Sequence, residues 1–186
     1  MTQRAIVFWL VPAQPERELF HGIISILAQQ LDAPPFAPHV TLFSIGSDVR
    51  LVNRVLKTIK REPLRLTLNG VRFSSQYTKT LFAQFRPSEE LNELVAVMQN
   101  AGGKRTAKIT DPHLSLCYKN LSAATKKRLS QLIRVPLRDV LFDTVYAVRC
   151  SASTRTAADV ASWEIIARRR MSSAPSRLRR PSFIAR

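Results

Sequence analysis

The chain has 186 residues, of which 45% are hydrophobic and 23% are charged, so it is long enough to bury one sizeable core. No apolar run in the sequence is long enough to span a bilayer, so we expect no transmembrane segment. The formal net charge is +16, which favours polyanionic partners such as nucleic acid, nucleotides or an anionic membrane surface. Seven of the basic residues are arginines that follow Glu164, after which there is no acid, yet the chain before them is also basic.

The two cysteines, Cys117 and Cys150, are too few for a disulfide framework. The short apolar run near the start passes directly into Pro12 without a small-residue cleavage site, so we expect no signal peptide. Reduced thiols and a cytoplasmic location are therefore the expectation.

Hydrophobic periodicity divides the chain into strands and helices. Segments with apolar residues at every second position are expected to be strands, and segments with apolar residues three and four apart are expected to be amphipathic helices. In chain order, the predictions are a strand over 5–11, a helix over 15–31, a strand over 37–42, a helix over 47–59, strands over 64–73 and 80–85, a helix over 88–101, a strand over 111–116, a helix over 122–133, and strands over 137–150 and 162–167.

The order of these elements indicates two similar halves. We expect an α+β fold in which antiparallel sheets meet at a central cleft and helices pack on the outside. Residues 1–167 would form this domain. Residues 168–186 are rich in arginine, serine and proline and poor in apolar residues, which is typical of a basic, disordered tail.

One short motif occurs twice in the chain. Residues 37–42 are Ala-Pro-His-Val-Thr-Leu, and residues 111–116 are Asp-Pro-His-Leu-Ser-Leu. Two of the three histidines of the chain lie in these copies. Because side chains two apart on a strand share a face, His39 would lie beside Thr41, and His113 beside Ser115. The aliphatic residues between them would enter the core.

An imidazole and a hydroxyl on each of two strands suit chemistry on a phosphodiester. Hydrolysis needs a base that activates water and an acid that protonates the leaving oxygen, and imidazole titrates near neutrality. The hydroxyls would stabilise charge on the non-bridging oxygens, and ring strain makes a cyclic phosphate a suitable substrate. A zinc site at His39 and His113 lacks a third ligand at sensible spacing, so we expect no metal and no cofactor.

The two copies resemble the paired His-x-Thr/Ser-x signatures of the two-histidine phosphoesterase superfamily. The similarity is closer to its cyclic phosphodiesterase branch, because residues 8–12, 35–42 and 79–82 resemble strands of that branch. Tyr118 follows the second motif at the spacing where the branch carries a water-positioning tyrosine. The resemblance extends over residues 5–167.

The resemblance implies a bilobal fold with pseudo-twofold symmetry around a water-filled cleft. It implies metal-independent hydrolysis of a 2′,3′-cyclic nucleotide or of ADP-ribose 1″,2″-cyclic phosphate, with a 2′- or 1″-phosphate as product. His39 and His113 would be the acid and base, and Thr41 and Ser115 would bind the phosphate. We favour His113 as the base, because Tyr118 would orient the same water.

Two of these residues also have plainer interpretations. On a regular strand Tyr118 points away from His113, so it would pack or cap the strand unless a bend brings it into the site. Cys117 shares the face of His113 and would lie on the floor of the cleft as inert packing.

Two other functions fit the same residues. One is an enzyme that processes terminal 2′,3′-cyclic phosphates of RNA, for which the basic body and tail would bind the substrate. The other is a module that binds RNA ends without turnover and with salt-sensitive affinity, although such a module has no need of two histidines. The expected partners are therefore the cyclic phosphate substrate and RNA, and the expected state is a monomer.

Overall fold

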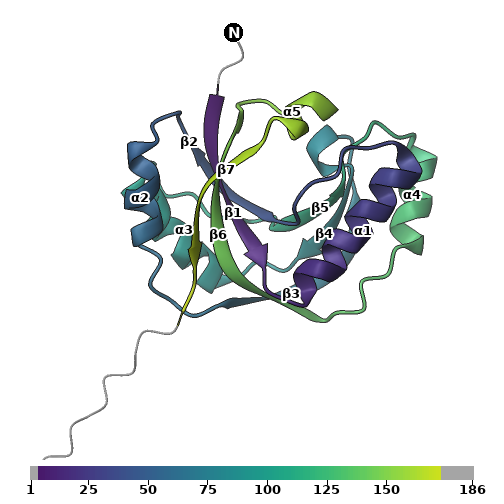
Figure 1. Cartoon of the computed structure of the whole chain (residues 1–186). Helices are drawn as coiled ribbons and strands as arrows, with labels where there is room; N and C mark the ends of the chain where they lie inside the picture. The colour runs from purple at the N-terminus through teal and green to yellow at the C-terminus, as the bar shows by residue number, and fades with distance from the viewer. Residues whose placement is uncertain (1–3, 173–186) are drawn as a thin grey trace, which may run out of the picture.

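The computed structural model describes residues 4–172 (Figure 1). The strands of this part of the chain are β1 (Arg4–Pro12), β2 (Val40–Ile45), β3 (Leu64–Phe73), β4 (Leu81–Phe85), β5 (His113–Cys117), β6 (Asp139–Ser151) and β7 (Glu164–Arg170). The helices are α1 (Glu16–Leu31), α2 (Arg50–Lys57), α3 (Glu89–Ala101), α4 (Ala123–Leu132) and α5 (Ala157–Ala161), with a 3₁₀ turn η1 (Tyr77–Lys79). Every strand and helix expected from the sequence occurs, in the expected order.

All the strand pairs are antiparallel, and the strands join in the order β1-β2-β5-β4-β3-β6-β7. Strand β6 also pairs with β1, so the order closes on itself. The length of β6 makes this possible, because its first residues pair with β3 and its later residues pair with β1. The α+β prediction is confirmed, and the strands form one connected sheet where we expected separate sheets.

The helices lie on the outside of the sheet, with α1 and α4 on one side and α2 and α3 on the other (Figure 1). Helix α1 buries Phe20, Ile24 and Leu27, which recur at the spacing of one helical face. Helices α3 and α4 each begin after a serine N-cap, because the side chains of Ser88 and Ser122 accept hydrogen bonds from backbone N–H groups of the first turn. None of the helices within residues 4–172 combines the length and the apolar character of a membrane span.

Two short elements were not expected from the sequence. The 3₁₀ turn η1 and the five-residue helix α5 are too short to show a hydrophobic period. Strand β7 continues to Arg170, three residues past the expected end of the domain at 167, because its backbone pairs with β6 as far as Thr144. The rest of the predicted tail, 173–186, lies outside the described residues, so its disorder stays a prediction.

The two motif strands are neighbours in the sheet. Strands β2 and β5 pair through Val40 and Leu114, whose side chains are 1% and 0% exposed. Around this antiparallel pair a local twofold axis relates the two motifs. It places His39 across from Ser115 and Thr41 across from His113.

We expect Leu114→Ala to lower the free energy of unfolding by about 2–5 kcal/mol, because the surrounding core cannot fully collapse into the space that the side chain leaves. Urea denaturation measures this loss. Leu132→Ala is the matched control, since Leu132 on α4 is 63% exposed, and its effect should stay within about 0.5 kcal/mol. Equal losses in the two variants would show that Leu114 does not have the central position described.

Candidate active site

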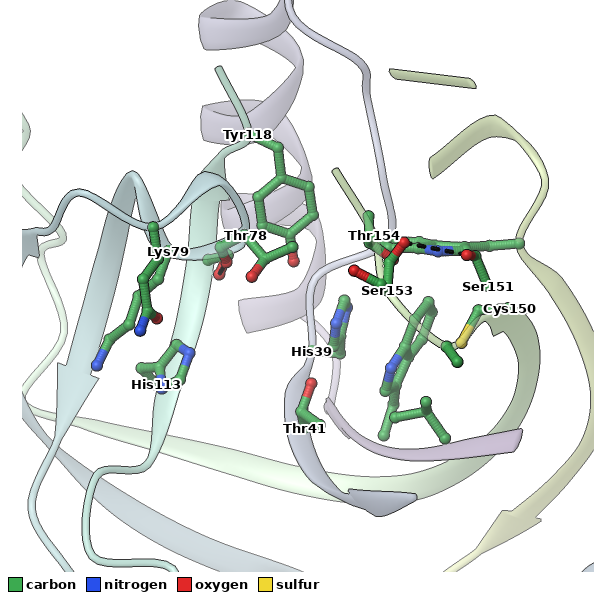
Figure 2. A pocket seen from close by; sticks show the side chains of 16 residues that line it. His39, Thr41, Thr78, Lys79, His113, Tyr118, Cys150, Ser151, Ser153 and Thr154 are labelled. Carbon is green, nitrogen blue, oxygen red and sulfur yellow. Dashed lines mark hydrogen bonds between the residues drawn. The ribbon is translucent and has the colours of Figure 1, made fainter. Parts of the chain in front are cut away.

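A cavity of about 460 Å³ lies where the two motif strands meet. All five residues singled out from the sequence line it: His39, Thr41, His113, Ser115 and Tyr118. Figure 2 shows the two imidazoles on facing sides of the open space, with Thr41 below His39 and Tyr118 above. The structure therefore brings together residues that are up to 79 positions apart in the chain.

The same backbone contact orients both histidines. The Nδ1 atom of His39 lies 2.7 Å from the carbonyl oxygen of Ala37, and that of His113 lies 2.9 Å from the carbonyl oxygen of Asp111. A carbonyl oxygen only accepts hydrogen bonds, so Nδ1 is the donor in each contact. In the neutral ring, Nε2 then keeps a free lone pair that can take a proton from a ligand.

Aromatic rings surround His39. Its imidazole stacks on Trp9 with ring centroids 3.7 Å apart and planes 11° apart, and the rings of Phe36 and Trp163 approach it edge-on. The side chain is 5% exposed. Burial lowers the pKa of His39 to about 4; its hydrogen bond to Ala37 opposes this shift, and the charge of nearby His113 adds to it. His39 is therefore neutral at physiological pH.

His113 has a more polar environment. It is half-buried, and the edge of the Phe82 ring lies against it with centroids 5.4 Å apart. Burial lowers the pKa of His113, and the Lys79 ammonium lowers it further. The carbonyl and the carboxylate of Asp111 act in the opposite direction. The two histidines therefore share a motif but differ in what surrounds them.

The two hydroxyls are not equivalent either. Thr41 is exposed on its strand, whereas Ser115 is 5% exposed and its hydroxyl donates to the carbonyl oxygen of Thr78 at 2.7 Å. Ser115 can donate to a bound phosphate only by releasing this carbonyl, but its oxygen is free to accept.

A bulge explains why Tyr118 borders the cavity and Cys117 does not. The register between β4 and β5 shifts next to Leu116, since Leu81 pairs with Cys117 while Phe82 pairs with Ser115. Such a shift breaks the alternation of side chains. The expectation that Cys117 lies on the cleft floor is wrong, because it is buried and not among the cavity-lining residues.

Both interpretations of Tyr118 find support in its position. Its ring stacks on Phe36 with centroids 4.0 Å apart, and it also lines the cavity. Burial raises the pKa of its hydroxyl, which therefore stays protonated and able to donate.

Several cavity-lining residues carried no clear signal in the sequence. Trp9 and Lys79 fall in segments noted only for their resemblance to family strands, and Trp163 has no motif around it. The hydroxyl-rich composition of residues 151–154 was the one signal that could have indicated a polar wall. The lining residues missed in this way are Val7, Trp9, Gln76, Thr78, Lys79, Cys150, Ser151, Ala152, Ser153, Thr154 and Trp163.

Within the described range 4–172, no three His, Cys, Asp or Glu side chains form a group that could hold a metal ion. The absence of a metal requirement stays a prediction.

A family match over residues 4–171 assigns the chain to the two-histidine phosphoesterase superfamily. The chain belongs to the family of cyclic phosphodiesterase-like proteins, whose model matches residues 4–171. No curated protein matches the chain by sequence.

Solved structures with the same fold have little sequence in common with the chain. E. coli LigT complexed with 3′-AMP has 15% identity and a TM-score of 0.58, covering 93% of this chain and 100% of LigT. The apo form of E. coli LigT has 14% identity and a TM-score of 0.57 over the same shares of the two chains. TT0787 of Thermus thermophilus has 13% identity and a TM-score of 0.57, covering 91% of this chain and 98% of TT0787. At these identities the likeness establishes the fold.

The low pKa of His39 makes stability depend on pH. Its ordinary value of 6.5 falls to about 4 on folding, so the unfolded chain binds this proton more tightly. The contribution of neutral His39 to the free energy of unfolding is complete above pH 6.5 and is lost as the pH falls toward 4. This contribution is on the order of 3 kcal/mol. Urea unfolding at pH 7 and pH 4 should show a smaller pH dependence in His39→Gln than in the wild type. His21→Gln, at an exposed position on α1, should keep the wild-type dependence, and an unchanged dependence in His39→Gln would contradict the assignment.

Proposed function

We propose that this protein hydrolyses a cyclic phosphodiester, either a 2′,3′-cyclic nucleotide or ADP-ribose 1″,2″-cyclic phosphate, without a metal ion. The observation that carries the proposal is the placement of His39 and His113 on one cavity, each with Nδ1 held by a backbone carbonyl. Such a pair supplies a proton acceptor and a proton donor on two sides of a phosphate. Membership of the cyclic phosphodiesterase-like family supports the class of reaction. Structures of E. coli LigT with 3′-AMP, NADP+ and ATP support a nucleotide ligand for this fold.

The surroundings of the histidines favour His39 as the base, the reverse of the assignment favoured from the sequence. A base must be neutral, and the burial that lowers the pKa of His39 to about 4 keeps it so. An acid must carry a proton, and His113 is the less buried ring and lies beside the Asp111 carboxylate.

In the proposed reaction, His39 Nε2 takes a proton from water as the water oxygen attacks phosphorus. The bond from phosphorus to one ring oxygen breaks, and His113 Nε2 gives its proton to that oxygen, which leaves a phosphate monoester and a free hydroxyl. Thr41 donates to one non-bridging oxygen, Ser115 donates to the other once its hydroxyl turns from the Thr78 carbonyl, and the Tyr118 hydroxyl orients the water.

A second candidate is the processing of RNA ends that carry a 2′,3′-cyclic phosphate. Three exposed arginines at the end of β7, Arg168 to Arg170, favour this activity. Their positive charges would attract the backbone phosphates of an RNA substrate. The sequence beyond residue 172 is also basic. We propose a cytoplasmic monomer in either case, and the two buried free thiols, Cys117 and Cys150, fit a reducing compartment.

A product assay on 2′,3′-cyclic nucleotides, ADP-ribose cyclic phosphate and cyclic-ended RNA tests the proposal. We expect His39→Ala and His113→Ala each to lower kcat by at least about 100-fold, because each removes a proton-transfer group. His21→Ala is the matched control and should retain wild-type activity, and EDTA should leave all rates unchanged. Turnover that survives both histidine substitutions would contradict the proposed mechanism of proton transfer by the two histidines. Salt-sensitive RNA binding with no product from any substrate would instead support a binding module.

The pH dependence of kcat/KM should be bell-shaped for the free enzyme. The rate rises with pH as His39 loses its proton near pH 4, and it falls as His113 loses its proton below the ordinary histidine value of 6.5. Bound anionic substrate favours protonated imidazole, so the kcat profile should lie at higher pH. A kcat/KM that first rises through pH 6.5 and then stays level to pH 8 would contradict His39 as the base.

A further inference from the structure

The two motif copies differ at the residue whose carbonyl holds the histidine. This residue is Ala37 in the first copy and Asp111 in the second. The local twofold around Val40 and Leu114 would make the two histidines equivalent if their neighbours were the same. The side chain of Asp111 therefore has no counterpart beside His39, where the aromatic rings of Trp9 and its neighbours take that place.

Asp111 belongs to a closed set of contacts around His113. The ammonium of Lys79 donates a hydrogen bond to the Asp111 carboxylate and lies 4.4 Å from the centre of the Phe82 ring. Phe82 in turn presents its ring against the His113 imidazole. The carbonyl of Asp111 completes the set, since it accepts from His113 Nδ1. Figure 2 shows Lys79 and His113 on the same side of the cavity, opposite His39.

Hydrogen bonds hold the backbone beside both partners of this ion pair. The carbonyl of Lys79 accepts from the hydroxyl of Ser74 at 2.8 Å, and the adjoining carbonyl of Thr78 accepts from Ser115. Next to Asp111, the side-chain amide of Gln84 donates to the carbonyl of Pro112 at 3.0 Å. Lys79 is also largely shielded from solvent, with 14% of its side chain exposed. The Asp111 side chain is 50% exposed, so the pair has one shielded partner and one that faces solvent.

We propose that the Lys79–Asp111 ion pair positions His113. The ion pair orients the imidazole and places two opposing charges beside it, so that His113 acts as the acid. This inference rests on the proposed function for the role of His113. Lys79 and Asp111 act through the imidazole.

The charges around His113 predict the direction in which its pKa changes when either partner of the ion pair is removed. The titratable or charged groups that face it are the Asp111 carboxylate, the Lys79 ammonium and, across the cavity, His39. The carboxylate favours the imidazolium and the ammonium disfavours it, so the two charges act on His113 in opposite directions. Removing the ammonium should raise the pKa of His113, and removing the carboxylate charge should lower it.

The test compares Lys79→Met, Asp111→Asn and the double variant in the full chain. The descending limb of kcat/KM against pH should move to higher pH in Lys79→Met and to lower pH in Asp111→Asn, and it should return toward the wild-type position in the double variant. We also expect each single variant to lose about tenfold in kcat, because the imidazole loses its fixed orientation. Lys79→Arg keeps the charge and should recover most of the rate. Arg50→Met, at the start of α2, breaks an exposed ion pair with Asp48; it is the control and should change neither limb nor rate.

A merely structural role would lower activity without opposite shifts of the limb, and that result would overturn the proposal. Titration of the His113 ring by NMR in the substrate-free protein supplies the same comparison without turnover. Opposite shifts of the ring pKa in an inactive protein would uphold the ion pair and overturn the proposed function. Unmoved ring pKa values in an active protein would overturn the role of the ion pair and leave the proposed function standing.

Discussion

The antiparallel contact between β2 and β5 is the constraint on which the site depends. Val40 and Leu114 are buried opposite each other, so the residues on either side of them face the cavity from two strands. Because antiparallel pairing relates the strands by a twofold axis, each histidine lies near the hydroxyl residue of the other motif. The rest of the sheet supports this contact, and β6 closes the order of strands around it.

Symmetry supplies two imidazoles, but the proposed acid and base need unequal ones. The structure makes them unequal through their surroundings. Around His39 the rings of Trp9, Phe36 and Trp163 exclude water, and exclusion of water disfavours a charged imidazole. Around His113 the Asp111 carboxylate and the Lys79 ammonium oppose each other. A duplicated motif therefore gives two histidines with distinct surroundings, as the proposed acid and base require, without any change in the motif histidines themselves.

The family match and the solved structures establish different properties of the chain. The family model covers residues 4–171 and identifies the class of protein. The LigT and TT0787 structures, at 13–15% identity, establish how the chain folds. Neither selects a substrate, which depends on the cavity walls. Those walls include Lys79 on one side and the hydroxyl-rich residues 151–154 on the other.

The sequence by itself determined the order of the strands and helices, because residues such as Leu91, Leu94 and Met98 repeat with the period of the helix that buries them. It also determined the histidine and hydroxyl pairs, because a duplicated motif is visible without coordinates. Only the tertiary structure decided the rest. The bulge at Leu116 brings Tyr118 to the cavity, and a bulge leaves no period to detect. The contact of Lys79 with Asp111 joins residues 32 positions apart, and the packing of Trp9 and Trp163 around His39 joins three separate segments. Such contacts depend on how the sheet closes, and the spacing of residues along the chain does not indicate which distant segments the closed sheet brings together.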